Sequence, residues 1–274
     1  MADQSSEEAA RLHKFVDPVS YLSAFVSNGV RPDGRSCSTA RNVTLNIGSI
    51  STANGSAMVK LGQTCVLAAV KMELSNPPLE CPSRGYLVCN IDQSSSSLSE
   101  ALSGPPTSEA QSLSQTLQDL LSRFVDCDDL ILVESKLCWT VYVDVVCLCN
   151  SGNVWDACVL ASTVALINTQ VPAVNTDVEL PLVSISSRRS LKLGTVPLAA
   201  TFTIFKDKYC LLDPSREEEL ICDGTVSVIY FEDGGIAQIT HAGKPLSSER
   251  LISMCKDGQT HTQTLYKLLN TVCT

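Results

Sequence analysis

Cysteine and histidine are the residues of this sequence whose chemistry could most directly serve a metal site or a nucleophile. The chain has 13 cysteines but only three histidines, His13, His241 and His261. No Cys-x-x-Cys occurs, and the one close pair, Cys147 and Cys149, lies in an apolar run whose alternate side chains would share one face of a strand. Ligand spacing gives no support to a zinc site. We expect no metal and no cofactor, and we interpret the thiols as small buried hydrophobic side chains in a reducing compartment.

Two further groups of polar residues could carry chemistry. The acidic run 217–219 is followed by Asp223, and paired carboxylates can act as acid and base or hold a metal ion. Three adjacent glutamates by themselves are more often a solvated turn, which is the interpretation that the residues alone favour. The run 31–35, with the sequence RPDGR, is also typical of a turn. We expect it to be solvated, with a weak local contact between Asp33 and an arginine.

Composition excludes several classes of protein. The 274 residues include 20 Lys and Arg against 29 Asp and Glu, a net charge of −9, so the surface as a whole cannot wrap nucleic acid electrostatically. A hydrophobic fraction of 44% excludes a mostly disordered chain. The acidic residues 1–10 do not resemble a secretory signal. The apolar stretches 139–149 and 157–167 are shorter than the ~18 residues of a membrane span. We expect a soluble intracellular protein.

The elements that would position any site follow from hydrophobic periodicity, which predicts runs of strands followed by a helix, twice over. In the first half we expect a helix at 18–26, strands at 43–47, 55–61, 64–70 and 86–91, exposed loops at 94–99 and 103–106, a helix from 108 whose apolar stripe includes Phe124, a strand at 137–149 and a buried helix at 154–167. In the second half we expect strands at 201–205, 209–212, 225–231 and 236–240, and a helix after Pro245 with core positions Leu246, Ile252, Leu265, Leu268 and Leu269.

This repetition predicts an α+β protein of two similar β-rich lobes, each with packed helices. We place an N-terminal helical extension at 1–29, the first lobe at 30–170, a connecting segment at 171–192 with a strand-like stretch at 182–185, and the second lobe at 193–274.

Short motifs occur along the chain in an ordered series. They are RPDGR at 31–35, TLNIGS at 44–49, GSAMVKLG at 55–62, SGPP at 103–106, GNVWDA at 152–157 and the pair Asp213-Pro214. In this order and spacing they resemble the ribonuclease PH family from residue 30 to the last helix. Their details are more similar to a ring subunit of the eukaryotic RNA exosome than to bacterial ribonuclease PH. The resemblance implies a ribonuclease PH-like fold and a family chemistry, phosphorolysis, in which inorganic phosphate attacks the last phosphodiester of an RNA 3′ end.

Phosphorolysis needs an arginine and other donors for the phosphate, positive charge along the RNA, and a carboxylate near the leaving oxygen. Active relatives have Gly-Thr-Arg or Gly-Ser-Arg in the phosphate pocket, where this chain has Gly152, Asn153 and Val154. Asn153 keeps a donor, but Val154 replaces the guanidinium that would neutralise phosphate. The resemblance therefore implies that this pocket is degenerate.

The other two requirements also fail when the chain is matched to active relatives. Where they place arginines before the second helix, this chain has Pro105, Pro106, Thr107 and Ser108, with no positive charge before Arg123. Of the two catalytic aspartates, the first is matched by Glu219 and the second by Thr225. Asp223 lies two residues early, an offset that need not point to the same place on a strand entry.

We therefore expect no catalytic residues and no enzymatic activity. The resemblance implies a structural subunit of an RNA exosome ring that supports 3′-to-5′ RNA processing, rRNA processing and degradation by its partners. It implies a hexameric ring of ribonuclease PH-like subunits, cap subunits with RNA-binding domains, RNA passing through the assembled complex, no membrane, and localisation in nucleus, nucleolus and cytoplasm. A few basic residues could face RNA: Lys60, Arg84, Arg188, Arg189 and Lys192. The simpler interpretation is that they supply ordinary solubilising charge.

Two other functions stay open at this point. One is an active phosphorolytic 3′-to-5′ exoribonuclease with a rearranged site around Glu219 and Asp223. The other is an independent RNA-binding module, against which the net charge of −9 argues.

Overall fold

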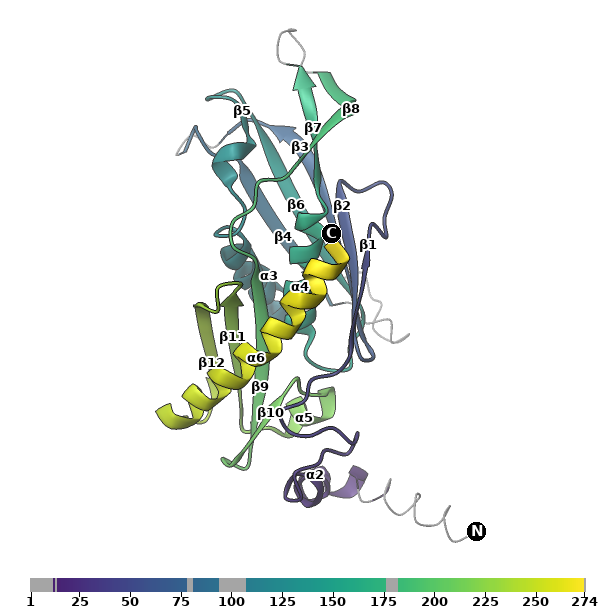
Figure 1. The fold of residues 1–274 in the computed structure, drawn as a ribbon, viewed down its shortest axis with the longest axis vertical. Helices are drawn as coiled ribbons and strands as arrows, with labels where there is room; N and C mark the ends of the chain where they lie inside the picture. Colours follow the sequence, from purple (N-terminus) through teal and green to yellow (C-terminus); the bar gives the residue numbers. More distant parts are fainter. Residues whose placement is uncertain (1–11, 13, 78–80, 94–106, 176–181, 274) are drawn as a thin grey trace, which may run out of the picture.

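The computed structural model describes residues 12, 14–77, 81–93, 107–175 and 182–273. The loops predicted at 94–99 and 103–106 lie outside the described residues. Within this part of the chain the structure contains two main sheets and a separate two-stranded hairpin, with helices between and beside them (Figure 1). The expected α+β class is therefore confirmed.

The first sheet forms where apolar and polar residues alternate in the first half of the chain. Its strands are β1 (Val43–Ile47), β2 (Gly55–Leu61), β3 (Thr64–Ser75), β4 (Tyr86–Asp92), β5 (Ile131–Val133) and β6 (Leu137–Cys149). The order is β1-β2-β3-β6-β4, with β5 beside β6. Only β4 runs parallel to its neighbour. Strand β3 extends beyond the predicted residue 70 because its pairing with β6 continues to Ser75 opposite Cys138.

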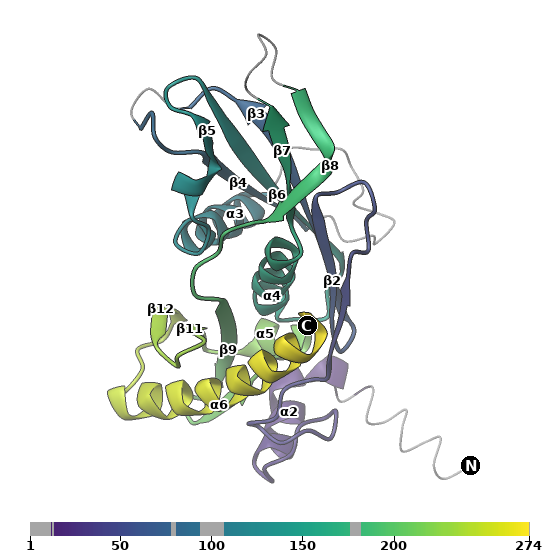
Figure 2. The ribbon, with the colours of Figure 1, turned by 45° about the horizontal axis from the view of Figure 1, so that its top comes forward.

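Two helices cover this sheet. Helix α3 (Ser108–Leu121) begins at Thr107, whose hydroxyl accepts from the Ala110 N–H, and it packs on β4. Phe124 is buried as predicted but lies beyond the end of α3. Helix α4 (Val154–Ile167) is apolar on nearly all sides, and such a helix must be buried. It contacts β2, β3 and β6 on one side and the second sheet on the other, so that it lies between the two sheets (Figure 2).

The second sheet contains β9 (Pro197–Phe205), β10 (Tyr209–Leu212), β11 (Gly224–Phe231) and β12 (Ile236–Gly243), in the order β10-β9-β11-β12. All residues of β9 are buried because α4 contacts this strand and α6 (Ser248–Cys273) crosses it as well (Figure 1). Helix α6 links the cores: Met254 belongs to the second sheet's core, whereas Leu265 and Leu269 pack in the first. The core assignment of Ile252 was wrong, because it lies on an uncovered flank of α6 and is 56% exposed.

The predicted connecting segment contains more structure than its strand-like stretch suggested. Strand β7 (Gln170–Asn175) pairs antiparallel with β8 (Leu182–Ser190) in a separate hairpin.

Helix α2 (Pro18–Val26) is capped by Asp17, as the Asp-Pro pair predicts, and buries Leu22 and Val26. A 3-10 turn, η1 (Cys127–Leu130), precedes β5.

The three glutamates at 217–219 do not form a solvated turn, so that interpretation was wrong. They lie in helix α5 (Arg216–Ile221), which begins with a capping box between Ser215 and Glu218. The Glu218 carboxylate is buried, and its charge is compensated there: it accepts from the Ser215 N–H at 2.8 Å and lies 3.5 Å from the Arg31 guanidinium.

The run 31–35 forms the expected turn, with residues 32–34 exposed, but the expectation that all of it is solvated was wrong for Arg31. The local contact between Asp33 and Arg35 is present at 2.6 Å. Arg31, however, is only 1% exposed, and its guanidinium donates to the backbone carbonyls of Leu212, Asp213 (3.1 Å) and Cys37 (3.0 Å). This arginine therefore fixes the N-terminal segment to the loop after β10.

Removing Arg31 should be strongly destabilising. In Arg31→Ala, Glu218 loses its buried counter-charge and the carbonyls lose their donor, which should lower the free energy of unfolding by about 3–5 kcal/mol. Urea unfolding measures this. Lys71→Ala is the control, since the Lys71–Glu73 pair is exposed and its loss should change stability by less than ~1 kcal/mol. An Arg31→Ala protein as stable as that control would contradict this account of the fold.

Candidate functional site

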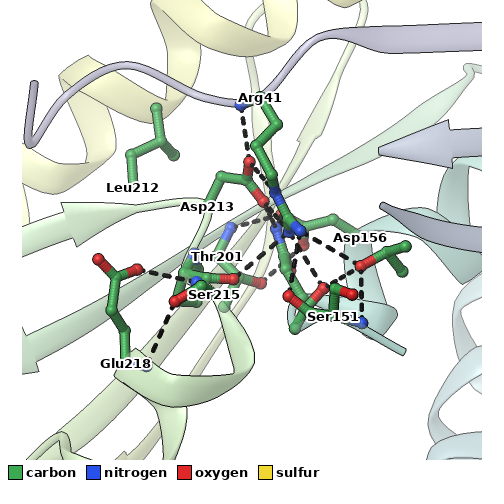
Figure 3. A network of polar contacts seen from close by, with 12 residues as sticks. Arg41, Ser151, Asp156, Thr201, Leu212, Asp213, Ser215 and Glu218 are labelled. Carbon is green, nitrogen blue, oxygen red and sulfur yellow. Dashed lines mark hydrogen bonds and ion pairs between the residues drawn. The ribbon is translucent and has the colours of Figure 1, made fainter. Parts of the chain in front are cut away.

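Two of the residues matched to the family's site, Asn153 and Glu219, contact each other beside a polar network in which three segments come together. The loop between β6 and α4 contributes residues 150–153, the loop between β10 and α5 contributes 213–215, and Arg41 precedes β1. Figure 3 shows these side chains converging from different elements around Asp213. The site therefore lies at the contact between the first and second sheets.

Gly152 allows the two loops to approach each other closely. Its φ is +94°, and a Cβ at this position would lie 2.3 Å from the Arg216 nitrogen and 2.4 Å from the Ser215 carbonyl carbon. Glycine is needed for both the conformation and the space. The Arg216 N–H donates to the Ser151 carbonyl at 3.1 Å, which joins the loops directly.

Asp213 is the buried centre of the network. Arg41 binds its carboxylate through both Nε (2.9 Å to Oδ2) and a terminal nitrogen (2.7 Å to Oδ1), and the Arg41 backbone N–H donates to Oδ2 at 2.7 Å. Burial alone would raise the pKa of Asp213, but these hydrogen bonds and the adjacent positive charge outweigh burial and lower it. Asp213 is therefore ionised and fixed by Arg41.

Asn153 does not offer its side-chain donor to an external anion. It adopts the left-handed conformation (φ 53°), which asparagine tolerates better than most residues. Its amide nitrogen donates to Asp156 Oδ2 and to Asp213 Oδ1, each at 2.8 Å. The donor that sequence analysis kept for phosphate is thus occupied by two carboxylates.

Glu219 occupies the backbone donor at the start of α4. Its Oε1 accepts from the Asn153 N–H at 2.7 Å, and the N-terminus of a helix attracts negative charge. Burial raises the pKa of Glu219, while the Asn153 N–H and the charge of Arg41 oppose that rise. An intramolecular carboxylate therefore lies where the loop would otherwise present an N–H to an anion.

The remaining family positions do not complete a catalytic set. Val154 is the first residue of α4 and is buried in the core. Asp223 contacts Lys244 (2.7 Å) and the Asp207 N–H (3.2 Å) instead of the network, and Lys244 lowers its pKa. Thr225 lies within β11, paired with Thr203 of β9. No hydrogen bond or ion pair joins Glu219 to Asp223 or routes both into one network among the described residues.

Asp156 extends the network to the second sheet. Its carboxylate accepts from the Thr201 N–H (2.8 Å) and the Thr201 hydroxyl (2.6 Å), in addition to Asn153. Burial raises the pKa of Asp156 to about 6, even though these donors oppose the rise. The Thr201 hydroxyl also lies 2.8 Å from the Ser227 hydroxyl, so the chain of contacts reaches β11.

Two spaces of very different size lie beside these side chains. An open groove of about 630 Å³ is lined by residues that include Arg41 and His261. A cavity of about 10 Å³ is bordered by Asn153, Asp156, Asp213 and His261. A space of this size holds about one water molecule. Burial lowers the pKa of His261, with the charge of Asp213 opposing it. The small cavity therefore brings an imidazole close to the network and has no room for more than a water molecule.

The basic residues proposed to face RNA do not form one surface. Three of them have acidic partners around η1: Arg84 lies 3.8 Å from Asp128, Lys192 lies 2.8 Å from Asp126, and Arg189 contacts Asp129. Lys60 is exposed on β2 and Arg188 is exposed on β8. Neither has an ion pair within the described part of the chain.

Comparisons with known proteins agree with this architecture. Residues 39–172 match the model of the 3′ exoribonuclease family, domain 1, and residues 195–260 match domain 2 of that family. A two-lobed ribonuclease PH-type protein is thus the class that the fold defines. The chain belongs to the 3′ exoribonuclease (ribonuclease PH) family, so the resemblance and the fold predicted from it are confirmed.

Named relatives place the chain more narrowly within this family. The exosome complex component Rrp42 of Sulfurisphaera tokodaii is 36% identical over 217 residues, covering 77% of this chain and 78% of the relative. The exosome complex component rrp43 of Schizosaccharomyces pombe is 31% identical over 248 residues, covering 89% and 92%. A chain of the Archaeoglobus fulgidus exosome with RNA bound to the active site superposes with a TM-score of 0.80 at 29% identity, covering 90% of this chain and 96% of that one.

Neither a metal centre nor a membrane span is found within the described residues. They contain no group of three or more His, Cys, Asp or Glu side chains arranged to hold a metal ion. No helix among those assigned there is both long and apolar enough to cross a membrane.

Sequence reasoning missed Arg41 and Asp156. Arg41 stands in no motif, and nothing nearby in the sequence pairs with it, because its partner Asp213 is 172 residues away. Asp156 did carry a signal: it is a single carboxylate in the apolar helix 154–167, and a buried charge must be paired or hydrogen-bonded.

The buried carboxylate of Asp156 should make stability depend on pH. Its pKa is raised from 3.8 to about 6 on folding, so the folded state binds more protons in this interval and stability falls as pH rises through it. Asp156→Asn keeps an acceptor for Asn153 and Thr201 N–H and carries no charge. The free energy of unfolding of the variant, minus that of the wild type, should increase by roughly 3 kcal/mol as the pH is raised from about 4 to about 7. Urea unfolding at several pH values measures this difference. A difference that does not change with pH would contradict the raised pKa.

Proposed function

We propose that this chain is a non-catalytic structural subunit of an RNA exosome ring, which supports 3′-to-5′ RNA processing and degradation carried out by partner subunits. Its named relatives are exosome complex components, and a solved relative that covers 98% of this chain, with a TM-score of 0.78 at 26% identity, is described as an archaeal exosome core. These names support a place in such an assembly.

The proposal that this chain is inactive rests on one observation: the loop before α4 already uses its polar groups in hydrogen bonds to other parts of the chain. The Asn153 N–H is bound by Glu219, the Asn153 amide by Asp156 and Asp213, and the Ser151 and Gly152 carbonyls accept from Arg41. A phosphate ion would have to displace these contacts.

Electrostatics points the same way. The carboxylates of Asp156, Asp213 and Glu219 surround this loop. The cation among them, Arg41, binds Asp213 through its Nε and one terminal nitrogen, so its charge is already paired. The valine at 154 adds no positive charge. An anionic nucleophile brought against an anionic RNA end would meet repulsion here, and loss of a strong transition-state donor alone costs roughly 10²–10³ in rate.

The finer parts of this function are proposed on the family resemblance. The partners would be other ribonuclease PH-like subunits of a hexameric ring and cap subunits with RNA-binding domains, with RNA passing through the complex. The substrates would include rRNA precursors, and the complex would act in nucleus, nucleolus and cytoplasm. Of the basic residues considered for RNA contact, Lys60 and Arg188 are the better candidates, because Arg84, Arg189 and Lys192 are already ion-paired.

Assembly is the direct test of the structural role. The tagged chain, purified gently from its own cells, should bring down other ribonuclease PH-type subunits, and the mass of the intact complex should correspond to a closed ring. Isolated, the chain should self-associate because contact surface is uncovered. The proposal would be contradicted if the tagged chain recovered no such subunit and the isolated chain were a monodisperse monomer.

Absence of phosphorolysis is the second test. Incubated with single-stranded RNA and inorganic phosphate, the purified chain should release no nucleoside diphosphate, because no phosphate can be held beside Val154. The comparison protein is Glu219→Ala, in which the α4 N–H is freed. Nucleoside diphosphate release by the wild type that disappears in this variant would establish an active exoribonuclease with a rearranged site instead.

A further inference from the structure

The free edge of β12 differs from the β4 and β10 edges in having no cover among the described residues. Strand β1 is also paired on one side only, but its exposed side chains, Thr44 and Asn46, are polar. At the edge of the first sheet, α3 supplies side-chain acceptors to β4: Gln118 accepts from the Cys89 N–H (3.5 Å) and Ser114 from the Ile91 N–H (2.9 Å). At the β10 edge of the second sheet, the Cys37 carbonyl accepts from the Leu212 N–H at 2.9 Å. In both places another segment of the chain uses the outward-facing backbone groups.

Strand β12 pairs with β11 on one side only. Within the part of the chain that the structure describes, no other segment makes a backbone hydrogen bond to residues 236–242. The strand, with the sequence IAQITHAG, contains no proline and no Lys, Arg, Asp or Glu. Exposed edges are normally protected by such residues, by bulges that twist them away or by a covering element. The ladder with β11 has one such irregularity, a register shift between Ile229 and Tyr230 near the start of β12. From Gln238 to Gly243 the pairing is regular, and this stretch has no charge and no cover among the described residues, so it is suited to pairing.

An apolar strip accompanies this edge. Ile236 and Ile239 lie opposite Tyr230 and Val228 in the ladder, so they share the sheet face that α6 covers, yet they remain 46% and 42% exposed. Ile252 of α6 is also exposed. It lies two helical turns before Gln259, whose amide nitrogen would lie 2.6 Å from a Cβ built on Gly234, in the turn between β11 and β12. Ile252 therefore lies on the flank of α6 that faces β12.

We propose that the β12 edge is where a neighbouring subunit of the same fold adds one of its own edge strands, with Ile236, Ile239 and Ile252 packing against it. This rests on the proposed function, since it assigns a contact surface to the ring subunit. The unpaired N–H and C=O groups select an extended strand, because only a strand matches their spacing. The uncharged edge favours a neutral, apolar strand and provides no cation for nucleic acid phosphates.

The test uses the full chain reconstituted with the ribonuclease PH-type subunits that its own cells supply. Ile239→Lys places a charge on the edge, and the lysine stem can extend into solvent without disturbing the core. The matched control is Asn46→Lys, which adds the same charge to an exposed position on β1, at the edge of the other sheet. Ile239→Lys should weaken assembly by at least ~10-fold, while the control assembles like wild type.

A second measurement needs no variant. In the wild-type assembly, backbone amides of 236–242 should exchange with deuterium at least ~10-fold more slowly than in the isolated chain, because they gain hydrogen-bond partners. The inference would be overturned if Ile239→Lys assembled normally and the β12 amides exchanged equally fast in the assembly and in the isolated chain. It would also be overturned if both lysine variants lost assembly to the same extent. If the wild type joins no such subunit, the proposed function fails first and this inference fails with it. Assembly of wild type without β12 protection overturns the inference alone.

Discussion

The buried ion pair between Arg41 and Asp213 is the interaction on which the arrangement of the two sheets depends. Asp213 follows β10 in the second sheet, whereas Arg41 leads into β1 of the first and also donates to the carbonyls of Ser151 and Gly152. Removing Arg41 would leave the buried Asp213 carboxylate with the longer contact to Arg35 at 3.3 Å as its ion pair among the described residues, and loss of a partner in such a place costs more than the intact pair contributes. The same contact therefore fixes the fold and the degenerate site.

The site and the packing cannot be separated in this molecule. Asn153 joins Asp156 to Asp213, and Asp156 joins α4 to Thr201 of β9. Groups that could have bound an external anion instead hold the second sheet against α4. An enzyme keeps such donors free for a transition state. Here these donors are already bonded within the chain.

Helix α6 has one face buried in the two cores and one exposed flank beside strand β12. Residues of α6 that face the sheets, such as Met254 and Leu269, are buried, while Ile252 on its flank is exposed beside an uncovered strand edge. A sheet edge is completed only by pairing or cover. The chain covers its β4 and β10 edges itself, whereas the β12 edge has no such cover among the described residues.

The sequence by itself determined the α+β class, most of the strand and helix positions, and the absence of an arginine at 154, because hydrophobic period and residue identity are local properties. It could not assign the contacts of Arg31 or of Glu219, whose partners lie 182 and 66 residues away. The tertiary structure decided these, turning an apparent surface turn into a buried anchor and an apparent solvated acid into an internal anion. Burial and charge pairing depend on segments distant in sequence, and only the packed fold brings them together.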